Sequence, residues 1–254
     1  MARSEQAISL IVTSFNNERL IGQCLASASF CAERIVVDSL STDRTAELAQ
    51  AAGARVFKRP WAGYVAQKQF ALEQATQPWV LLLDSDEQAT FALGQEIATT
   101  LAAGATADGY RIHRILYHLG HYFTGRLYPD WPIRLFRRDR AHIGGVDPHD
   151  RVEVAGRVAR LRAPILHFSY VDVADHVASI NRLTSRAAQQ GRPGALTSVR
   201  MLTHPLWRFF NFYFLRGGIG GGGRGLYASM AAAFYVFLKY AKLYERRLAT
   251  RRGR

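Results

Sequence analysis

The first third of the chain alternates short apolar runs with segments of helical periodicity. Four runs rich in apolar and β-branched residues predict strands, at 8–13, 34–38, 55–58 and 79–84. Between them, apolar residues recur at helical spacing, which predicts one helix after residue 20, one ending near residue 52 and one over 67–74. This order predicts a doubly wound, mostly parallel α/β sheet, whose ligands lie at the carboxyl ends of the strands.

The pattern loosens beyond residue 107. Further strands are predicted at 109–115, at 133–137 and within 160–170, and a helix at 173–189. The segment 190–197, QGRPGALT, is typical of a linker. Asn16 and Asn17 are expected to cap the first helix, and Ser41, Thr42 and Asp43 the second.

The C-terminal tail carries most of the net charge of +13. From residue 200 onwards there are eleven Lys and Arg and one acid, Glu245, which leaves 22 basic and 19 acidic residues in the first 199 positions. Two apolar, aromatic stretches, 201–215 and 226–238, flank a glycine-rich segment. The fourteen uncharged residues over 225–238 fall short of the roughly 18 that a spanning helix needs. A basic, amphipathic helical tail of this kind predicts binding to an anionic membrane surface, and a nucleic-acid partner is the alternative.

The two cysteines and the N-terminus bear on location. Cys24 and Cys31 have no metal-ligand spacing and are expected to be buried, in a helix and at its exit, in a reducing compartment. Residues 1–6 lack the apolar core of a signal peptide. The expected location is therefore cytoplasmic, peripheral on the inner face of the cell membrane.

Three acidic loops follow the first, second and fourth predicted strands. Their sequences are TSFNNE at 13–18, DSLSTD at 38–43 and DSDE at 84–87. In a doubly wound sheet these loops converge on one crevice. A crevice lined with carboxylates binds phosphate only with a divalent cation between them, and Mg²⁺ or Mn²⁺ also neutralises charge on a departing diphosphate.

Three other patterns do not point to a site. Counted from Asp84, the EF-hand positions 6 and 12 hold Ala89 and Gln95 in place of Gly and Glu, which excludes a calcium loop. The GxGxxG match at 218–223 follows no strand and is interpreted as a flexible hinge. His118 and His121 are assigned to an acceptor loop or to the surface.

The ordered motifs resemble family 2 glycosyltransferases of the GT-A fold. The resemblance runs through VTSFNNE, IVVDSLSTDRT, WAGYVAQKQFAL, WVLLLDSDE, YPDWPIRLFRR, PHDRVEV, ILHFSY and FLKYAKLYE, and so covers nearly the whole chain. It is nearest to the bacterial lipopolysaccharide core β-1,4-glucosyltransferases. It implies an inverting transfer of a hexose, glucose, from a UDP-sugar to a lipid-linked saccharide. It also implies a donor-binding half at 1–108, an acceptor-binding half at 109–190 and a tail at 198–254.

The resemblance implies roles for named residues. Asp86 would hold the Mg²⁺ or Mn²⁺, with Asp84 beside it and His167 as a late metal or diphosphate contact, although His167 is equally compatible with a core histidine. Arg134 is a candidate diphosphate anchor, and so is Arg138 if the strand alternates its faces. Donor contacts are implied for a further set: Thr13, Phe15, Glu18, Asp38, Ser41, Gln67 and Lys68.

Three positions depart from the family pattern. Leu40 stands where Gly is usual, so the turn after Asp38 is expected to differ, because Leu tolerates positive φ poorly. Gln69 stands where Asn is common. Asp150 replaces Glu, which shortens the carboxylate's reach by about one methylene.

The catalytic base is expected in the second half of the chain, because metal and nucleotide occupy the donor loops. Asp150 is the first choice, after a turn predicted at 144–145, with His149 to orient it. Asp147 and Asp130 are the alternates, and a helix cap is the non-catalytic interpretation of Asp150.

Two other functions compete with this hypothesis. A nucleotidyltransferase or sugar-nucleotide pyrophosphorylase would have a Gly-rich, basic loop after the first strand, which this chain lacks. A non-catalytic nucleic-acid binder would use the basic tail, but it leaves the three acidic loops without a role. No nucleic-acid partner is therefore expected.

Overall fold

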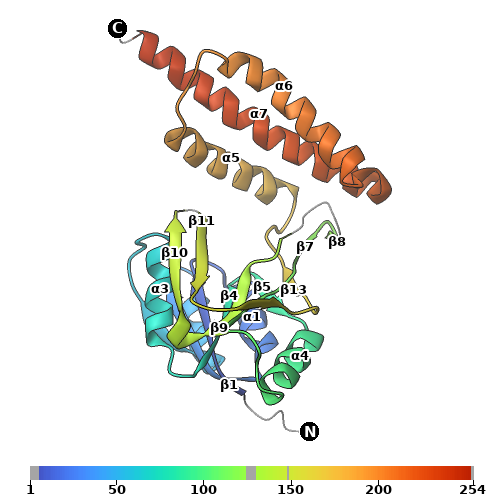
Figure 1. Ribbon diagram of the computed structural model, residues 1–254. Coiled ribbons are helices and arrows are strands. Elements are labelled where there is room, and N and C mark those ends of the chain that lie inside the picture. The colour runs from blue at the N-terminus through green and yellow to red at the C-terminus, as the bar shows by residue number, and fades with distance from the viewer. Residues whose placement is uncertain (1–5, 124–129, 148, 253–254) are drawn as a thin grey trace. The chain divides into compact units, whose positions relative to one another are not determined.

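The computed structural model describes residues 6–123, 130–147 and 149–252, and the chain forms two compact units (Figure 1). Unit 1 comprises 1–116 and 129–168, and unit 2 comprises 117–128 and 169–254. Unit 1 contains the predicted sheet. Unit 2 is mainly helical.

The central sheet of unit 1 has the strand order β12-β6-β9-β4-β1-β2-β3. Its parallel part contains four strands: β1 (Gln6–Ser14), β2 (Cys31–Asp38), β3 (Arg55–Lys58) and β4 (Trp79–Asp84). Strand β9 (Ile133–Arg137) pairs antiparallel with β4 and with β6 (Gly109–Arg111), and β12 (Val158–Arg160) is parallel to β6. The predicted mostly parallel sheet is confirmed.

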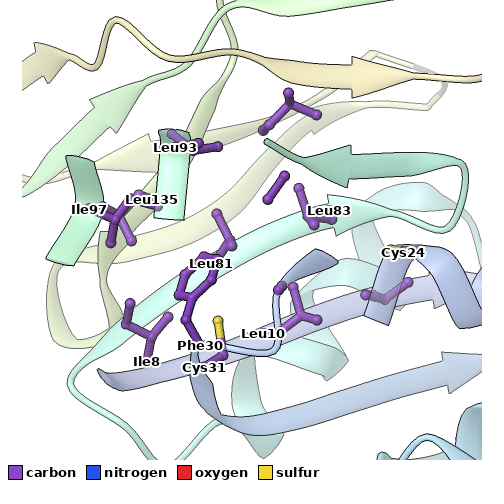
Figure 2. Close-up of a cluster of buried hydrophobic side chains, with 14 of the residues drawn as sticks. Ile8, Leu10, Cys24, Phe30, Cys31, Leu81, Leu83, Leu93, Ile97 and Leu135 are labelled. Carbon is purple, nitrogen blue, oxygen red and sulfur yellow. The ribbon is translucent and has the colours of Figure 1, made fainter. Parts of the chain in front are cut away.

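Both faces of this sheet are covered, as its strand sequences require. Leu81 and Leu83 of β4 pack on one side with α1 (Ile21–Ser27), α2 (Thr45–Ala51) and α4 (Phe91–Ala102) (Figure 2). Their neighbours Val80 and Leu82 point to the other side, against α3 (Tyr64–Gln74) and the hairpin of β10 (Ala141–Val146) and β11 (His149–Val154). A strand buried on both faces is a continuous apolar run because side chains alternate between the faces.

Several local predictions were wrong. The run 109–115 is two strands, because the chain leaves β6 in the central sheet and enters β7 (Arg114–His118) beside β13 (Ile165–His167) and β5 (Glu87–Ala89). Gly144 and Gly145 lie within β10 and form no turn; a side chain on Gly145 would overlap the carbonyl oxygen of His149 on β11. Helix α1 has no side-chain cap, because the Asn16 and Asn17 side chains bond to neighbouring loops. Cys31 is buried as predicted but begins β2.

Unit 2 is built on three long helices. These are α5 (Val173–Gln190), α6 (Thr197–Phe210) and α7 (Gly222–Arg252), and the short strand β8 (His121–Phe123) also belongs to it. A π-helical turn, η2 (Asn211–Leu215), and a 3₁₀ turn, η3 (Gly218–Gly221), join α6 to α7. Within the described part of the chain, no helix is long and apolar enough to cross a membrane.

The glycine-rich segment of unit 2 forms η3 and the start of α7, and two of its glycines, Gly218 and Gly225, are closely packed. Its interpretation as a flexible hinge stays a prediction. A side chain on Gly225 would overlap the carbonyl oxygen of Gly218, and one on Gly218 would lie 2.8 Å from the Ser229 hydroxyl. The glycines allow the start of α7 to lie against the chain that leads into it.

Candidate active site

Loops after β1, β2 and β4 meet at one edge of the sheet, which confirms the predicted convergence. The Asn16 amide oxygen accepts from the Thr42 backbone N–H at 2.8 Å, and the Asn16 N–H donates to the Ser41 hydroxyl at 2.9 Å. The Asn17 side chain donates to the Ser85 hydroxyl at 2.9 Å. Asparagine side chains thus bind the three loops together.

The turn after β2 keeps a glycine-like conformation despite its leucine. Leu40 has φ of +62°, and its side chain is exposed. Asp38 is fully buried, and its two carboxylate oxygens accept from the Ser41 hydroxyl at 2.5 Å and the Ser41 N–H at 2.9 Å. The expectation that leucine alters this turn was therefore wrong, because the buried carboxylate holds the loop in its strained shape.

The other residues of the expected nucleotide pocket lie around these loops. Thr13 is half-buried at the end of β1, and Phe15 is 58% exposed. The Glu18 carboxylate accepts from the Arg44 N–H at 3.0 Å, while its own N–H donates to Asp43 at 3.1 Å. Glu18 therefore braces the loops against each other in this structure.

Gln67 lies on α3 and is completely buried. Its side-chain N–H donates to the Ser39 hydroxyl at 3.0 Å and to the Pro60 carbonyl at 3.3 Å. Its Oε1 atom is buried and has no hydrogen-bond partner among the described residues. A buried acceptor left unpaired costs free energy, so this atom is suited to a ligand N–H or O–H.

Asp84 is the centre of a dense network of charges. Lys68 Nζ lies 2.9 Å from Asp84 Oδ1, and Arg134 donates to Asp84 Oδ2 at 2.8 Å. Arg134 and Arg114 also reach the buried Glu87, at 2.7 and 3.0 Å. Burial alone would raise the pKa of Asp84, but Lys68, Arg134 and Arg114 hold it well below the usual value. Asp84 is therefore an anion already neutralised by protein cations.

Lys68 links the end of β4 to strand β11. Its Nζ also donates to Asp150 Oδ2 at 2.8 Å, across 82 residues of sequence. Burial alone would lower the pKa of Lys68, but Asp84 and Asp150 raise it, so the lysine stays protonated between the two carboxylates. Asp150 lies on strand β11, which excludes its interpretation as a helix cap.

The other candidate bases are placed differently. His149 is exposed at the start of β11. Asp147 accepts from the Val65 N–H at 3.1 Å in the first turn of α3. Asp130 forms an ion pair with Arg114 at 2.5 Å. Asp150 therefore contacts the Asp84 network through Lys68, and Asp130 contacts it through Arg114.

Asp86 faces His167. Residues 87 and 167 pair in the small sheet, which leaves His167 Nε2 3.3 Å from Asp86 Oδ2. Burial alone would lower the pKa of His167, but the Asp86 carboxylate raises it. Both side chains remain partly accessible, at 30% for Asp86 and 20% for His167.

These two residues fit a divalent ion that shares its ligands with a substrate. Among the described residues, no group of three or more His, Cys, Asp or Glu is placed to hold a metal. Mg²⁺ commonly keeps one or two carboxylate ligands and takes the rest from water and substrate phosphates. Asp86, with His167 as a nitrogen ligand, meets that minimum, whereas the oxygens of Asp84 already contact Lys68 and Arg134.

Sequence reasoning missed Glu87 and Arg114 and misjudged Arg138. Glu87 is fully buried against both arginines, and Arg114 binds carboxylates from two loops. The alternation of strand β7 puts Arg114 on one face but cannot say which carboxylate it meets. Arg138 lies in an exposed 3₁₀ turn, η1 (Arg138–Arg140), outside this network.

The fold is that of a glycosyltransferase of the GT-A type. The chain belongs to glycosyl transferase family 2, whose pattern matches residues 9–155. It is 34% identical to the "Lipopolysaccharide core biosynthesis glycosyltransferase LpsC" of Rhizobium meliloti (strain 1021), over 94% of this chain and 92% of that protein. It is 31% identical to an uncharacterized glycosyltransferase of Rickettsia felis, over 94% and 90% of the two chains.

Solved structures agree on the fold. The chain is similar to S. aureus TarS 1–349, with a TM-score of 0.52 and 14% identity over 95% of this chain and 91% of that one. The same protein in complex with UDP-GlcNAc gives a TM-score of 0.51 and 15% identity, over 97% and 92% of the two chains. The GT-A fold predicted from the sequence is confirmed.

Proposed function

We propose that this glycosyltransferase moves a hexose, glucose, from a UDP-sugar to a lipid-linked saccharide such as the lipopolysaccharide core, with inversion at the anomeric carbon. The likeness to LpsC supports the acceptor class. The fold shared with a protein solved with UDP-GlcNAc supports a UDP-sugar donor. The reaction would take place in the cytoplasm, at the inner face of the membrane.

One observation carries the proposal. Lys68 lies within 2.9 Å of Asp84 and 2.8 Å of Asp150, so a single buried cation holds the donor-loop carboxylate and a carboxylate of the second half together. An inverting transfer needs a base on the face of the sugar opposite the departing diphosphate, and a carboxylate held beside the donor loops can serve as that base.

Asp150 is the proposed general base. The acceptor hydroxyl oxygen forms the new bond to the anomeric carbon, the bond from that carbon to the UDP oxygen breaks, and the hydroxyl proton passes to Asp150. Lys68 contacts Oδ2 of Asp150, so Oδ1 would take the proton. Lys68 holds the carboxylate in place before the transfer.

Donor binding is assigned to the converging loops. Thr13, Phe15 and Asp38 would line the base and ribose pocket, and the unpaired Oε1 of Gln67 would accept from a donor hydroxyl or ring N–H. Asp86 and His167 would hold the Mg²⁺ or Mn²⁺. When bound, that ion supplies charge neutralisation for the departing diphosphate. The remaining donor contacts are assigned to Glu18, Ser41, Lys68 and Arg134.

The test is Asp86→Ala, measured as UDP release from UDP-glucose with a lipid-linked acceptor and Mn²⁺. We expect less than about a tenth of the native rate, a loss above about 1.4 kcal/mol in transition-state stabilisation, with an unchanged melting temperature. Asp139→Ala is the matched control, since Asp139 is an exposed carboxylate in the 3₁₀ turn after β9. Native activity in Asp86→Ala would remove Asp86 from the proposed site.

A further inference from the structure

Helix α6 has two apolar faces, and only one of them is packed. Phe212, just beyond its end, is buried, and His204 of α6 contacts Tyr240 of α7 with ring centroids 5.1 Å apart. The opposite side carries a stripe at helical spacing that remains exposed: Val199 at 54%, Leu202 at 68%, Leu206 at 65% and Phe210 at 45%. Apolar side chains on the outside of a helix pair require a partner or an apolar medium.

Helix α7 repeats this arrangement. Tyr227 and Lys242 face α5, where they bind His176 and Asn181, and Val236 is buried. A third face carries a second exposed stripe: Leu226 at 44%, Met230 at 54%, Phe234 at 40% and Phe237 at 42%. This stripe lies opposite the buried residues Ala228 and Leu243, because each residue turns a helix by about 100°.

The two stripes belong to one pair of helices. Helices α6 and α7 are joined by a short turn and lie side by side, running in opposite directions (Figure 1). Each stripe lies on a side of its own helix that the rest of unit 2 leaves exposed. We name the exposed side chains of both stripes the apolar face of unit 2. Its eight residues are Val199, Leu202, Leu206, Phe210, Leu226, Met230, Phe234 and Phe237.

The charges of these helices lie outside the apolar face. Arg208 and Arg216 lie over the ring of the buried Phe212, at 5.1 and 4.9 Å from its centroid. Lys242 and Arg246 bind carbonyl oxygens of α5. From residue 200 onwards the sequence has eleven Lys and Arg and a single acid.

We propose that the apolar face of unit 2 docks on an anionic lipid bilayer, with α6 and α7 lying in the plane of the interface. An apolar face of Leu, Phe and Met combined with a polar face rich in Lys and Arg is the composition of an interfacial helix. The basic excess selects anionic lipid over neutral lipid. The same excess opposes a second copy of the chain as the occupant, because two such units repel each other.

The experiment is co-sedimentation of the full chain with vesicles of phosphatidylcholine alone or mixed with phosphatidylglycerol. We expect binding to the mixed vesicles, weakened by salt, and little to phosphatidylcholine alone. The double variant Leu206→Glu with Phe234→Glu should bind at least tenfold more weakly. Val171→Glu is the matched control and should bind like the native chain, because Val171 is 61% exposed but lies outside α6 and α7.

Circular dichroism of each variant separates lost binding from lost folding. Equal binding of the double variant and the native chain would overturn the proposal. So would a native dimer, seen by light scattering, that the double variant abolishes, because a second copy would then cover the face. Asp86→Ala should bind vesicles like the native chain, so a failure of the proposed transfer reaction is distinguishable from a failure of this docking surface.

Discussion

At the residue scale, Asp150 and Lys68 depend on each other. Lys68 is buried, with its side chain 6% exposed, and Asp150 is 16% exposed, so their contact is only weakly screened by water. A buried ammonium without partners would lose its proton, and here two carboxylates prevent this. The pair therefore holds the Asp150 carboxylate at a fixed place beside the donor loops.

Substituting Asp150 with Asn tests its role as the base. Asn has nearly the same shape and can still accept from Lys68, but it cannot take a proton. We expect kcat to fall by at least about 10²-fold, with little change in the KM for the UDP-sugar. Steady-state kinetics with varied donor measures both quantities. Near-normal turnover with a raised KM would instead assign Asp150 to donor binding.

Leu40 shows how a residue can be held against its own preference. A non-glycine residue at positive φ costs roughly 1–2 kcal/mol. The bonds from Ser41 to the buried Asp38 hold the turn in this conformation, at 2.5 and 2.9 Å. The strain is thus located in a loop assigned to nucleotide binding, where the position of Asp38 and Ser41 matters more than the side chain at 40.

At the element scale, the turn between α6 and α7 depends on glycine at some positions and not at others. A Cβ on Gly225 would overlap the backbone of Gly218, whereas a Cβ on Gly223 would meet nothing within 4 Å. Both residues belong to α7 and therefore share a helical backbone. The two positions differ in what surrounds them.

We therefore expect opposite effects from two alanine substitutions. Gly225→Ala should lower the free energy of unfolding by about 1–3 kcal/mol, because backbone atoms must move apart. Gly223→Ala should leave it unchanged or raise it by up to about 1 kcal/mol, because alanine is the better helix former. Urea denaturation followed by circular dichroism measures both. Equal effects would show that the turn is looser than the structure indicates.

A cluster of rings joins α5 to α7 within unit 2. His176 Nδ1 lies 2.7 Å from the Tyr227 hydroxyl, and its ring stacks on Tyr170 with centroids 3.9 Å apart. His118 contacts the same group and is 3% exposed, so its assignment to the surface was wrong. Burial, and to a lesser degree the neighbouring His118, lower the pKa of His176 to about 4, while Asp175 opposes the shift.

This cluster predicts acid sensitivity. The folded chain holds His176 neutral, with a pKa below the usual 6.5, so the unfolded chain binds more protons in acid. The contribution to stability is complete above about pH 6.5 and is lost as the pH falls towards about 4. We expect the melting temperature to fall over this range, and to fall less in His176→Phe. An identical pH profile in that variant would exclude His176 as the cause.

At the scale of the whole molecule, the site has many charges but few metal ligands. Asp86 and His167 are the pair assigned to the ion, and the described residues contain no third His, Cys, Asp or Glu placed with them. The metal ion and the nucleotide should therefore bind cooperatively, because the phosphates of the nucleotide supply ligands that the protein does not.

This coupling can be measured without turnover. We expect Mg²⁺ or Mn²⁺ alone to change the melting temperature little, UDP alone to raise it slightly, and both together to raise it by more than the sum. A ligand at 100 times its Kd stabilises the folded chain by about 2.7 kcal/mol. In Asp86→Ala the excess over the sum should vanish. A full shift with the ion alone would indicate a complete protein site that these residues do not form.

The parallel arrangement of the first four strands and the convergence of their loops could be predicted from the sequence alone. Continuous apolar runs such as Trp79–Asp84 must be buried on both faces, and the βαβ order then brings the loops at 13–18, 38–43 and 84–87 to one edge. The roles proposed for Asp84, Asp86 and Asp150 rest on this convergence and on the family resemblance. Local periodicity also predicted α5, and the two apolar stretches of the tail overlap α6 and α7.

Only the tertiary structure decided which side chains meet. Lys68 and Asp150 are 82 residues apart, and Arg134 and Glu87 are 47 apart, so no local pattern records either pair. The split of 109–115 into β6 and β7 depends on which strands lie alongside, and so does the hairpin of β10 and β11. Periodicity reports how a segment divides its apolar and polar sides, whereas the partner of each side is set by packing between segments distant in sequence.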